Sequence, residues 1–141
     1  MKLLILNGPN LNLIGSREPE IYGKLGFDDA FLSWQAKYPQ LELSYFQSNI
    51  EGEIIDKLQQ ANGDFDGIIL NAGGYTHTSV SIGDAVKAIK TPVIEVHLSN
   101  VMSREDFRHI SFISPSAEGI ISGFGLMSYE LAFFFFLNQS K

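Results

Sequence analysis

Short apolar runs alternate along the chain with longer stretches in which apolar residues recur every three or four positions. Runs of the first kind are typical of strands buried on both faces of a sheet. The periodic stretches are typical of helices with one buried side. We therefore expect strands at residues 2–6, 41–46, 67–70, 92–96 and 119–122, and helices at residues 27–38, 50–61, 81–89, 104–108 and 127–137.

Local signals set several of these boundaries. Pro39 is expected to end the first helix, because proline cannot continue the hydrogen-bonded ladder. Residues 48–51 read Ser-Asn-Ile-Glu, which resembles a capping box at the start of the second helix. That helix is expected to close at Asn62-Gly63. One face of it should carry Ile50, Ile54, Leu58 and Ala61.

Residues 133–136 are four consecutive phenylalanines within the last expected helix. A helix cannot bury four successive side chains on one side, so this helix should be covered on more than one face. We expect core packing on one side and a subunit contact on another, rather than a ligand-binding role.

Regular alternation of strands and helices indicates an α/β fold with a five-stranded parallel sheet and helices on both faces. The chain has 141 residues, of which 45% are hydrophobic. This length and composition fit a single domain over residues 1–141 with a sizeable core.

Composition narrows the classes of function. The absence of cysteine removes disulfides and thiolate metal sites and fits a reducing compartment. A net charge of −6 argues against a nucleic-acid partner. No apolar run reaches membrane-spanning length, and no secretory signal is visible. We expect a cytoplasmic protein with neither a nucleic-acid nor a membrane partner.

Polar residues gather in three loops that follow strands at the same edge of the expected sheet, which is where ligands bind in open α/β folds. The first loop holds Arg17 and Tyr22, a pairing that suggests a base whose proton affinity is lowered by a neighbouring charge. The third loop leads to Arg104 and Arg108. The three loops together predict a pocket for a small polyhydroxylated acid, with an arginine for the carboxylate and a histidine to move a proton.

Single residues of this set also have structural interpretations. A histidine at a strand end, such as His97, is more often a structural hydrogen-bonding group. Glu95 lies two residues earlier and so points to the same strand face; it is either a charge at the sheet edge or a carboxylate that orients the imidazole. No histidines or carboxylates have metal-ligand spacing, and Gly73-Gly74 lacks the spacing of a nucleotide-binding loop, so we expect no metal.

Four linked motifs resemble type II 3-dehydroquinate dehydratases in order, spacing and placement at strand ends, over nearly the whole chain. The motifs are Asn7-Gly-Pro-Asn-Leu-Asn-Leu-Ile-Gly-x-Arg17-Glu-Pro-x-x-Tyr22-Gly, Asn71-Ala-Gly-Gly-Tyr-Thr-His77-Thr-Ser, Glu95-Val-His97-Leu-Ser99-Asn and Arg104-Glu-x-Phe-Arg108. The resemblance implies a flavodoxin-like sheet, no cofactor, and a homododecamer built as a tetramer of trimers. It also implies a lyase of the shikimate pathway that removes water from 3-dehydroquinate to give 3-dehydroshikimate.

The same resemblance implies catalytic roles. Tyr22 matches the general base that removes the proton at C2 of the substrate, and Arg17 matches the lid residue that keeps this tyrosine acidic. Asn10 matches the residue that supports the enolate. His97 matches the general acid that protonates the departing C1 hydroxyl, with Glu95 nearby.

Further positions match residues that bind the substrate in this family. Asp84 matches an aspartate that reaches the site across a trimer contact, and Gly83 stands before it where an arginine is common. The other substrate-binding positions are Asn71, Gly73, Gly74, His77, Leu98, Ser99 and Arg108.

Three other interpretations are open at this stage. A type I dehydroquinase needs a Schiff-base lysine, and only Lys24, at the edge of the lid, lies near a strand-end motif. A non-enzymatic flavodoxin-like module would bind a flavin or a phosphate without dehydration. An inactive relative kept for assembly is disfavoured because Arg17, Tyr22 and His97 are all present.

Overall fold

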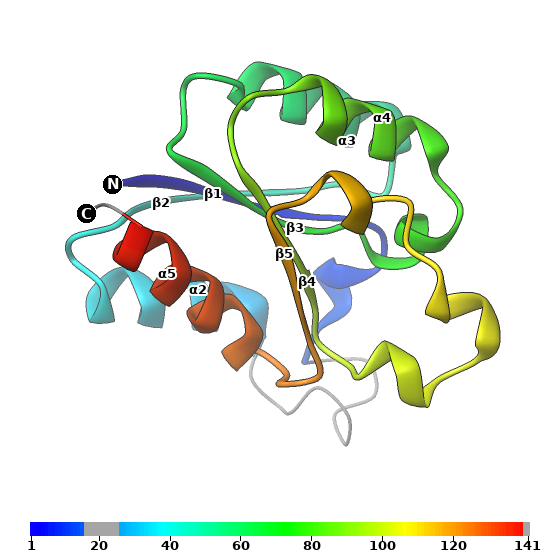
Figure 1. Cartoon of the computed structure of the whole chain (residues 1–141). Coiled ribbons are helices and arrows are strands. Elements are labelled where there is room, and N and C mark those ends of the chain that lie inside the picture. Colours follow the sequence, from blue (N-terminus) through cyan, green and yellow to red (C-terminus); the bar gives the residue numbers. More distant parts are fainter. Residues whose placement is uncertain (16–25, 140–141) are drawn as a thin grey trace.

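Five parallel strands form the centre of the molecule, in the order β2-β1-β3-β4-β5 (Figure 1). The structure is a computed structural model and describes residues 1–15 and 26–139. This strand order is that of flavodoxin-like folds and confirms the expected fold class. The strands are β1 (Lys2–Asn7), β2 (Glu42–Gln47), β3 (Gly67–Asn71), β4 (Val93–His97) and β5 (Gly119–Ser122).

Helices cover both faces of the sheet, with α3 and α4 on one side and α2 and α5 on the other (Figure 1). Their bounds are α2 (Phe27–Lys37), α3 (Glu51–Ala61), α4 (Val80–Ala88) and α5 (Met127–Gln139). Short 3-10 helices occupy the connections: η1 (Leu11–Leu13), η2 (Gly73–His77), η3 (Val101–Ser103), η4 (Asp106–His109) and η5 (Ser114–Ser116). The short helical piece expected near residues 104–108 corresponds to the 3-10 helix η4, which begins two residues later.

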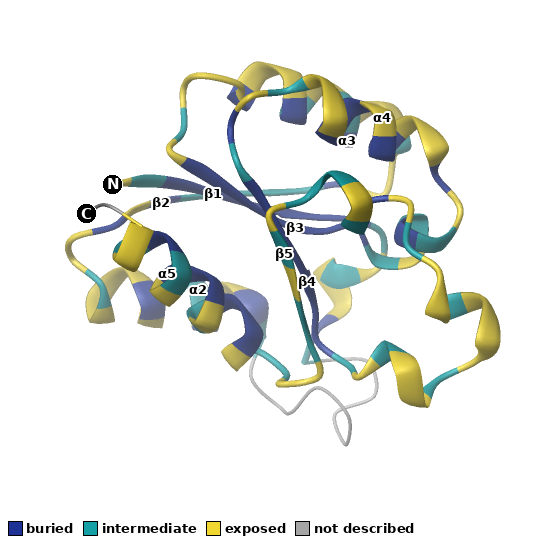
Figure 2. Ribbon diagram, viewed as in Figure 1, coloured by how far each residue is buried: buried dark blue, intermediate teal, exposed yellow. Residues whose placement is uncertain are grey.

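Alternate residues of β1 feed two separate cores. Leu3 and Ile5 pack with α2 and α5, whereas Leu4 and Leu6 pack with α3 and α4. This follows from the two-residue repeat of a strand, and it explains why β1 is apolar on both faces between its two end residues. Burial of each such side chain contributes about 1.5–3 kcal/mol. Figure 2 shows the resulting pattern, with buried residues along the strands and on the inner sides of the helices.

The start of α3 differs from the capping box expected at residues 48–51. The N-cap residue is Ile50, with no side-chain cap, and Glu51 is already the first residue of the helix. Ser48 Oγ instead accepts from the Ile50 backbone N–H and donates to Glu53. The reciprocal bond fails because the helix begins too late for Glu51 to occupy the third position.

The buried face of α3 also differs from expectation at one position. Ile50 precedes the helix and is 58% exposed, because the extended N-cap conformation turns it away from the sheet. The other expected members, Ile54, Leu58 and Ala61, are buried.

The four consecutive phenylalanines of α5 lie on different sides of the helix and differ in burial. Phe133 and Phe136 are buried against the sheet, while Phe135 is half-buried and Phe134 is 67% exposed. The expected core packing of this helix is confirmed, and the expected subunit contact stays a prediction. No helix in the described part of the chain is long and apolar enough to cross a membrane.

Candidate active site

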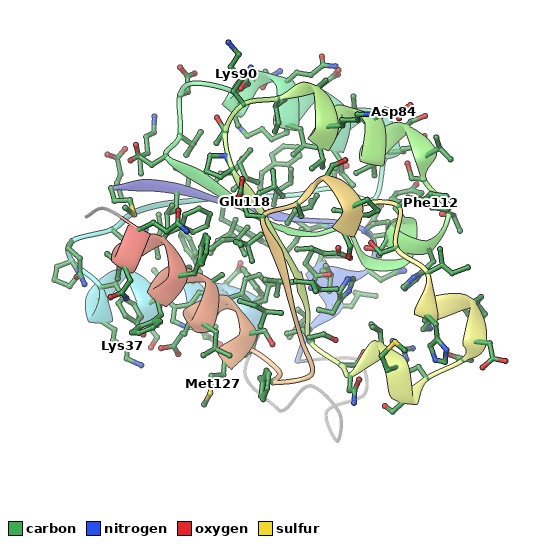
Figure 3. All side chains as sticks on the ribbon, in the orientation of Figure 1. Lys37, Asp84, Lys90, Phe112, Glu118 and Met127 are labelled. Atoms are coloured by element: carbon green, nitrogen blue, oxygen red, sulfur yellow. The ribbon has the colours of Figure 1, made fainter. Side chains whose placement is uncertain are left out.

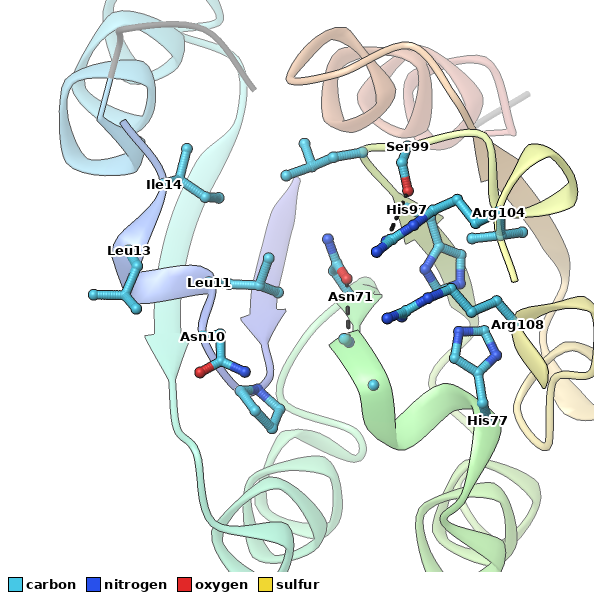
Figure 4. A pocket seen from close by; sticks show the side chains of 15 residues that line it. Asn10, Leu11, Leu13, Ile14, Asn71, His77, His97, Ser99, Arg104 and Arg108 are labelled. Carbon is cyan, nitrogen blue, oxygen red and sulfur yellow. Dashed lines mark hydrogen bonds between the residues drawn. The ribbon is translucent and has the colours of Figure 1, made fainter. Parts of the chain in front are cut away.

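A cavity of about 200 Å³ opens at the carboxyl edge of the sheet, between the loops that follow β1, β3 and β4 (Figure 4). This is the location expected from the polar strand ends. Nine of the residues singled out from the sequence line it: Asn10, Asn71, Gly73, Gly74, His77, His97, Leu98, Ser99 and Arg108.

Other sequence-derived candidates lie elsewhere. Arg17 and Tyr22 fall outside the described residues. Glu95 does not line the cavity but contacts His97 from within the protein. Asp84 is exposed on α4 and does not line this chain's cavity (Figure 3).

His97 and Glu95 form a buried pair at the end of β4. The Nε2 atom of His97 lies 2.7 Å from Glu95 Oε1, and the exposed fractions of the two residues are 6% and 0%. Of the two sequence-based interpretations of Glu95, this contact is the one expected if the carboxylate orients the imidazole, and that role stays a prediction. Since Nε2 is directed at Glu95, Nδ1 is the ring nitrogen left for a ligand.

Glu95 is held as a carboxylate although it is fully buried. Burial raises the pKa of this carboxyl, but hydrogen bonds from His97, Ser114 and Ser111 outweigh burial and bring the pKa below its ordinary value. Ser111 Oγ lies 2.9 Å from Oε1 and 3.1 Å from Oε2, and Ser114 Oγ donates to Oε2. The Glu95 carboxylate is thus a fixed hydrogen-bond acceptor behind the His97 ring.

His77 stands beside this pair as a neutral hydrogen-bonding group. Its ring stacks on His97 with 6.1 Å between centroids, and its Nδ1 lies 2.7 Å from the carbonyl oxygen of Ile110. A carbonyl only accepts, so Nδ1 carries the proton and Nε2 is left as an acceptor. Burial lowers the pKa of His77, against the opposing effect of the Ile110 hydrogen bond. His77 is thus suited to accept from a ligand hydroxyl at neutral pH.

Asn71 has its amide orientation fixed from below. Its Nδ2 donates to Tyr129 Oη at 3.0 Å, and its Oδ1 accepts from the Gly73 backbone N–H at 3.2 Å. The Tyr129 hydroxyl donates to Asn7 Oδ1 at 2.8 Å, and burial raises the pKa of that hydroxyl far above its ordinary value. A neutral, fully buried phenol therefore links the ends of β1 and β3 beneath the cavity.

Backbone geometry brings the first two loops together. Asn10 adopts a left-handed conformation with φ of 68°, which asparagine tolerates better than most residues, and its N–H donates to Asn49 Oδ1 at 3.0 Å. Gly73 also has a positive φ, of 59°, and a Cβ there would lie 3.0 Å from the Pro9 carbonyl oxygen. Glycine at this point lets the β3 loop approach the β1 loop and present its backbone to the cavity.

Two arginines supply positive charge to the cavity from the third loop, and Figure 4 shows both side chains extending toward it. Arg108 Nε donates to Glu105 at 2.8 Å, and its guanidinium lies 4.9 Å from the Phe107 ring centroid. Arg104 donates to Ser99 Oγ at 3.3 Å. The pair is suited to a carboxylate ligand.

The sequence analysis placed Arg104 beside the expected pocket but assigned a substrate-binding role to Arg108 alone, whereas both arginines line the cavity. The apolar wall was also missed, because Leu11, Leu13, Ile14 and Val101 carry no chemistry that a motif search would select. In the described part of the chain, no group of three or more histidines and carboxylates could hold a metal ion.

Comparisons with known proteins place the chain in a family. A family model described as dehydroquinase class II matches residues 1–137. A 3-dehydroquinate dehydratase of Prochlorococcus marinus is 54% identical over 134 residues, covering 94% of this chain and 91% of that protein. One from Geotalea daltonii is 51% identical over 143 residues, covering 100% of this chain and 99% of that protein.

A solved structure extends the likeness to three dimensions. The crystal structure of type II dehydroquinase from Butyrivibrio crossotus matches with a TM-score of 0.90 and 44% sequence identity, and covers 97% of each chain. The family matches span the strands, the loops and the cavity described above, so this chain belongs to the class II dehydroquinase family.

Proposed function

We propose that this chain removes water from 3-dehydroquinate to give 3-dehydroshikimate, the hydro-lyase step of the shikimate pathway that leads to chorismate and the aromatic amino acids. Two relatives named 3-dehydroquinate dehydratase match this chain over more than nine-tenths of both sequences. The observation that carries the proposal is the buried His97–Glu95 pair facing a cavity with two arginines.

The chemistry asks for one base and one acid. The base removes a proton from C2, next to the ketone. The acid then gives a proton to the C1 hydroxyl, which leaves as water, so the net change is the loss of one water. No electrons are gained or lost overall, and the reaction therefore needs no redox cofactor. The enolate that forms between the two steps requires a hydrogen-bond donor at its oxygen.

The described residues provide the acid and the binding groups. His97, backed by Glu95, protonates the leaving hydroxyl through Nδ1. Arg108 binds the substrate carboxylate with the help of the loop at Leu98 and Ser99. The remaining hydroxyl and enolate oxygens are bound by Asn71, Gly73, Gly74, His77 and Asn10, with Asn10 serving the enolate.

The base is assigned to Tyr22, with Arg17 as its charged neighbour. These two residues lie outside the described part of the chain, so the assignment rests on the family resemblance of the first motif. A neighbouring guanidinium favours the phenolate over the phenol. The phenolate is the form that can accept a proton near neutral pH.

The proposal includes an assembly and a location. The chain acts as a single catalytic domain in a cytoplasmic homododecamer, in which Asp84 reaches the site of a neighbouring subunit. The exposed position of Asp84 on α4, outside this chain's own cavity, is compatible with that contact.

The test is to add 3-dehydroquinate to the purified protein and follow the ultraviolet absorbance of the conjugated enone product. We expect absorbance to rise with time and protein concentration. Borohydride added with the substrate should leave the protein unmodified, since no lysine forms a Schiff base. A protein that produces no enone, or one that borohydride traps, would contradict the proposal.

A further inference from the structure

Two serines outside the four family motifs contact the buried carboxylate behind His97. Ser111 and Ser114 lie 16 and 19 residues beyond Glu95 in the chain; Ser111 is in the irregular segment before η5, and Ser114 is the first residue of η5. The cavity is not lined by either serine. Neither serine touches a ligand in this cavity, so we expect any effect of these serines on the reaction to act through Glu95.

The direction of the Ser111 hydroxyl is determined by its surroundings. Ser111 Oγ accepts from the backbone N–H groups of Ile113, at 3.1 Å, and Ser114, at 3.0 Å. A hydroxyl oxygen has two lone pairs, and both are occupied by these donors. The single hydroxyl proton is left to point at the Glu95 carboxylate, 2.9 Å from Oε1. Ser111 is thereby a fixed donor.

The position of the serine segment is itself fixed by contact with α4 and η2. Phe112 N–H donates to the Thr76 carbonyl at 2.9 Å, and Ile113 is fully buried. The Phe112 carbonyl oxygen would lie 2.3 Å from a Cβ at Gly83. Gly83 therefore admits the serine segment close to α4.

We propose that Ser111 and Ser114 are positioning residues that hold the Glu95 carboxylate in one orientation, so that it fixes the tautomer and angle of His97 for the loss of water. With His97, they give the carboxylate three donors for its roughly four lone-pair sites. The inference deepens the proposed function and rests on it, because His97 acts only in the second chemical step.

This arrangement predicts which step a serine variant will slow. Substrate binding uses the arginines and the other cavity groups, and removal of the C2 proton is assigned to Tyr22. Loss of one donor to Glu95 should therefore slow loss of water while leaving the KM and C2 proton exchange near wild type. A merely structural role would weaken all of these together.

Ser114→Ala is the sharper variant, because the Ser114 hydroxyl has Glu95 as its partner and Ser111 also supports two backbone N–H groups. Ser116→Ala is the matched control in the same 3-10 helix. The Ser116 backbone N–H donates to the Ile113 carbonyl oxygen, and alanine keeps that bond. The readouts are kcat and KM for enone formation, deuterium exchange at substrate C2, and thermal unfolding.

We expect Ser114→Ala to lower kcat about tenfold, the factor for one lost hydrogen bond to a charged group, with the KM within about twofold and exchange retained. Ser116→Ala should match wild type. If the alanine variant does not fold, Ser114→Cys keeps a side chain of similar shape with a weak donor and should show the same selective loss.

A wild-type kcat in the variant, or equal losses in exchange and dehydration, would overturn the inference and leave the proposed function intact. An inactive wild-type protein would instead overturn the proposed function, and this inference with it.

Discussion

His97 Nε2 lies 2.7 Å from Glu95 Oε1, and both residues are buried where β4 reaches the cavity. The pair follows from their separation by two residues on one strand, which directs both side chains to the same face. It commits one ring nitrogen to the protein and leaves the other for the substrate. The proposed acid is therefore oriented by the sheet itself.

Replacing Glu95 with glutamine tests the value of that orientation. The amide keeps the size of the side chain but replaces the charged hydrogen-bond acceptor of His97 with a neutral group, so kcat should fall by about tenfold. The KM should change little, because Glu95 does not line the cavity. Steady-state kinetics measure both quantities. Glu118→Gln, at an exposed carboxylate, is the control; unchanged turnover in Glu95→Gln would contradict the role of the pair.

The same carboxyl should make stability depend on pH. Hydrogen bonds lower the pKa of Glu95 in the folded protein below its ordinary 4.5, so the unfolded chain binds the proton more readily. The stabilisation is therefore present above 4.5 and is lost as the pH falls through the folded-state pKa. Urea unfolding on either side of that pH should show a steeper loss of stability in wild type than in Glu95→Gln. Parallel curves would refute this.

Removing the Tyr129 hydroxyl should loosen the floor of the cavity. Tyr129→Phe leaves Asn71 and Asn7 without their shared buried partner, at a cost of about 1–3 kcal/mol in the free energy of unfolding. The KM should rise because Asn71 loses its orientation. Denaturant unfolding and kinetics measure the two effects. Tyr75→Phe, which removes a more exposed hydroxyl bond to the Asn49 carbonyl, should cost less and leave the KM unchanged.

Gly83→Ala should destabilise the protein although alanine is the better helix former. The new methyl group would meet the Phe112 carbonyl oxygen at 2.3 Å, which requires a shift of backbone and costs about 1–3 kcal/mol. Gly52→Ala is the matched control, since a Cβ at this position of α3 meets nothing within 4 Å. That variant should be neutral or stabilised. Equal unfolding free energies for both variants would argue against the close contact.

Sequence patterns predicted the sheet, the four long helices and the edge on which the cavity lies. These features depend on residue periodicity and on polar strand ends, both of which are local signals. The start of α3 was misplaced because Ser48 bonds to Glu53 rather than to the helix backbone near Glu51. This bond spans five residues, a spacing that the three-residue pattern of a capping box does not predict.

The candidate site was predictable where chemistry stands in a motif, as for His97 and Arg108. Ser111 and Ser114 were not predictable, because the segment that brings them to Glu95 is irregular and depends on the approach of Phe112 to Gly83. The apolar wall of the cavity escaped notice for a different reason: leucine and isoleucine there resemble ordinary core residues.

The central claim is that His97 acts as the acid after the C2 proton has left, and one experiment addresses it directly. His97→Ala is incubated with 3-dehydroquinate in deuterated water, and C2 deuteration and enone absorbance are followed together. We expect deuterium at C2 with almost no enone, while Tyr22→Phe, run alongside, should give neither. Enone formation at the wild-type rate by His97→Ala would contradict the account.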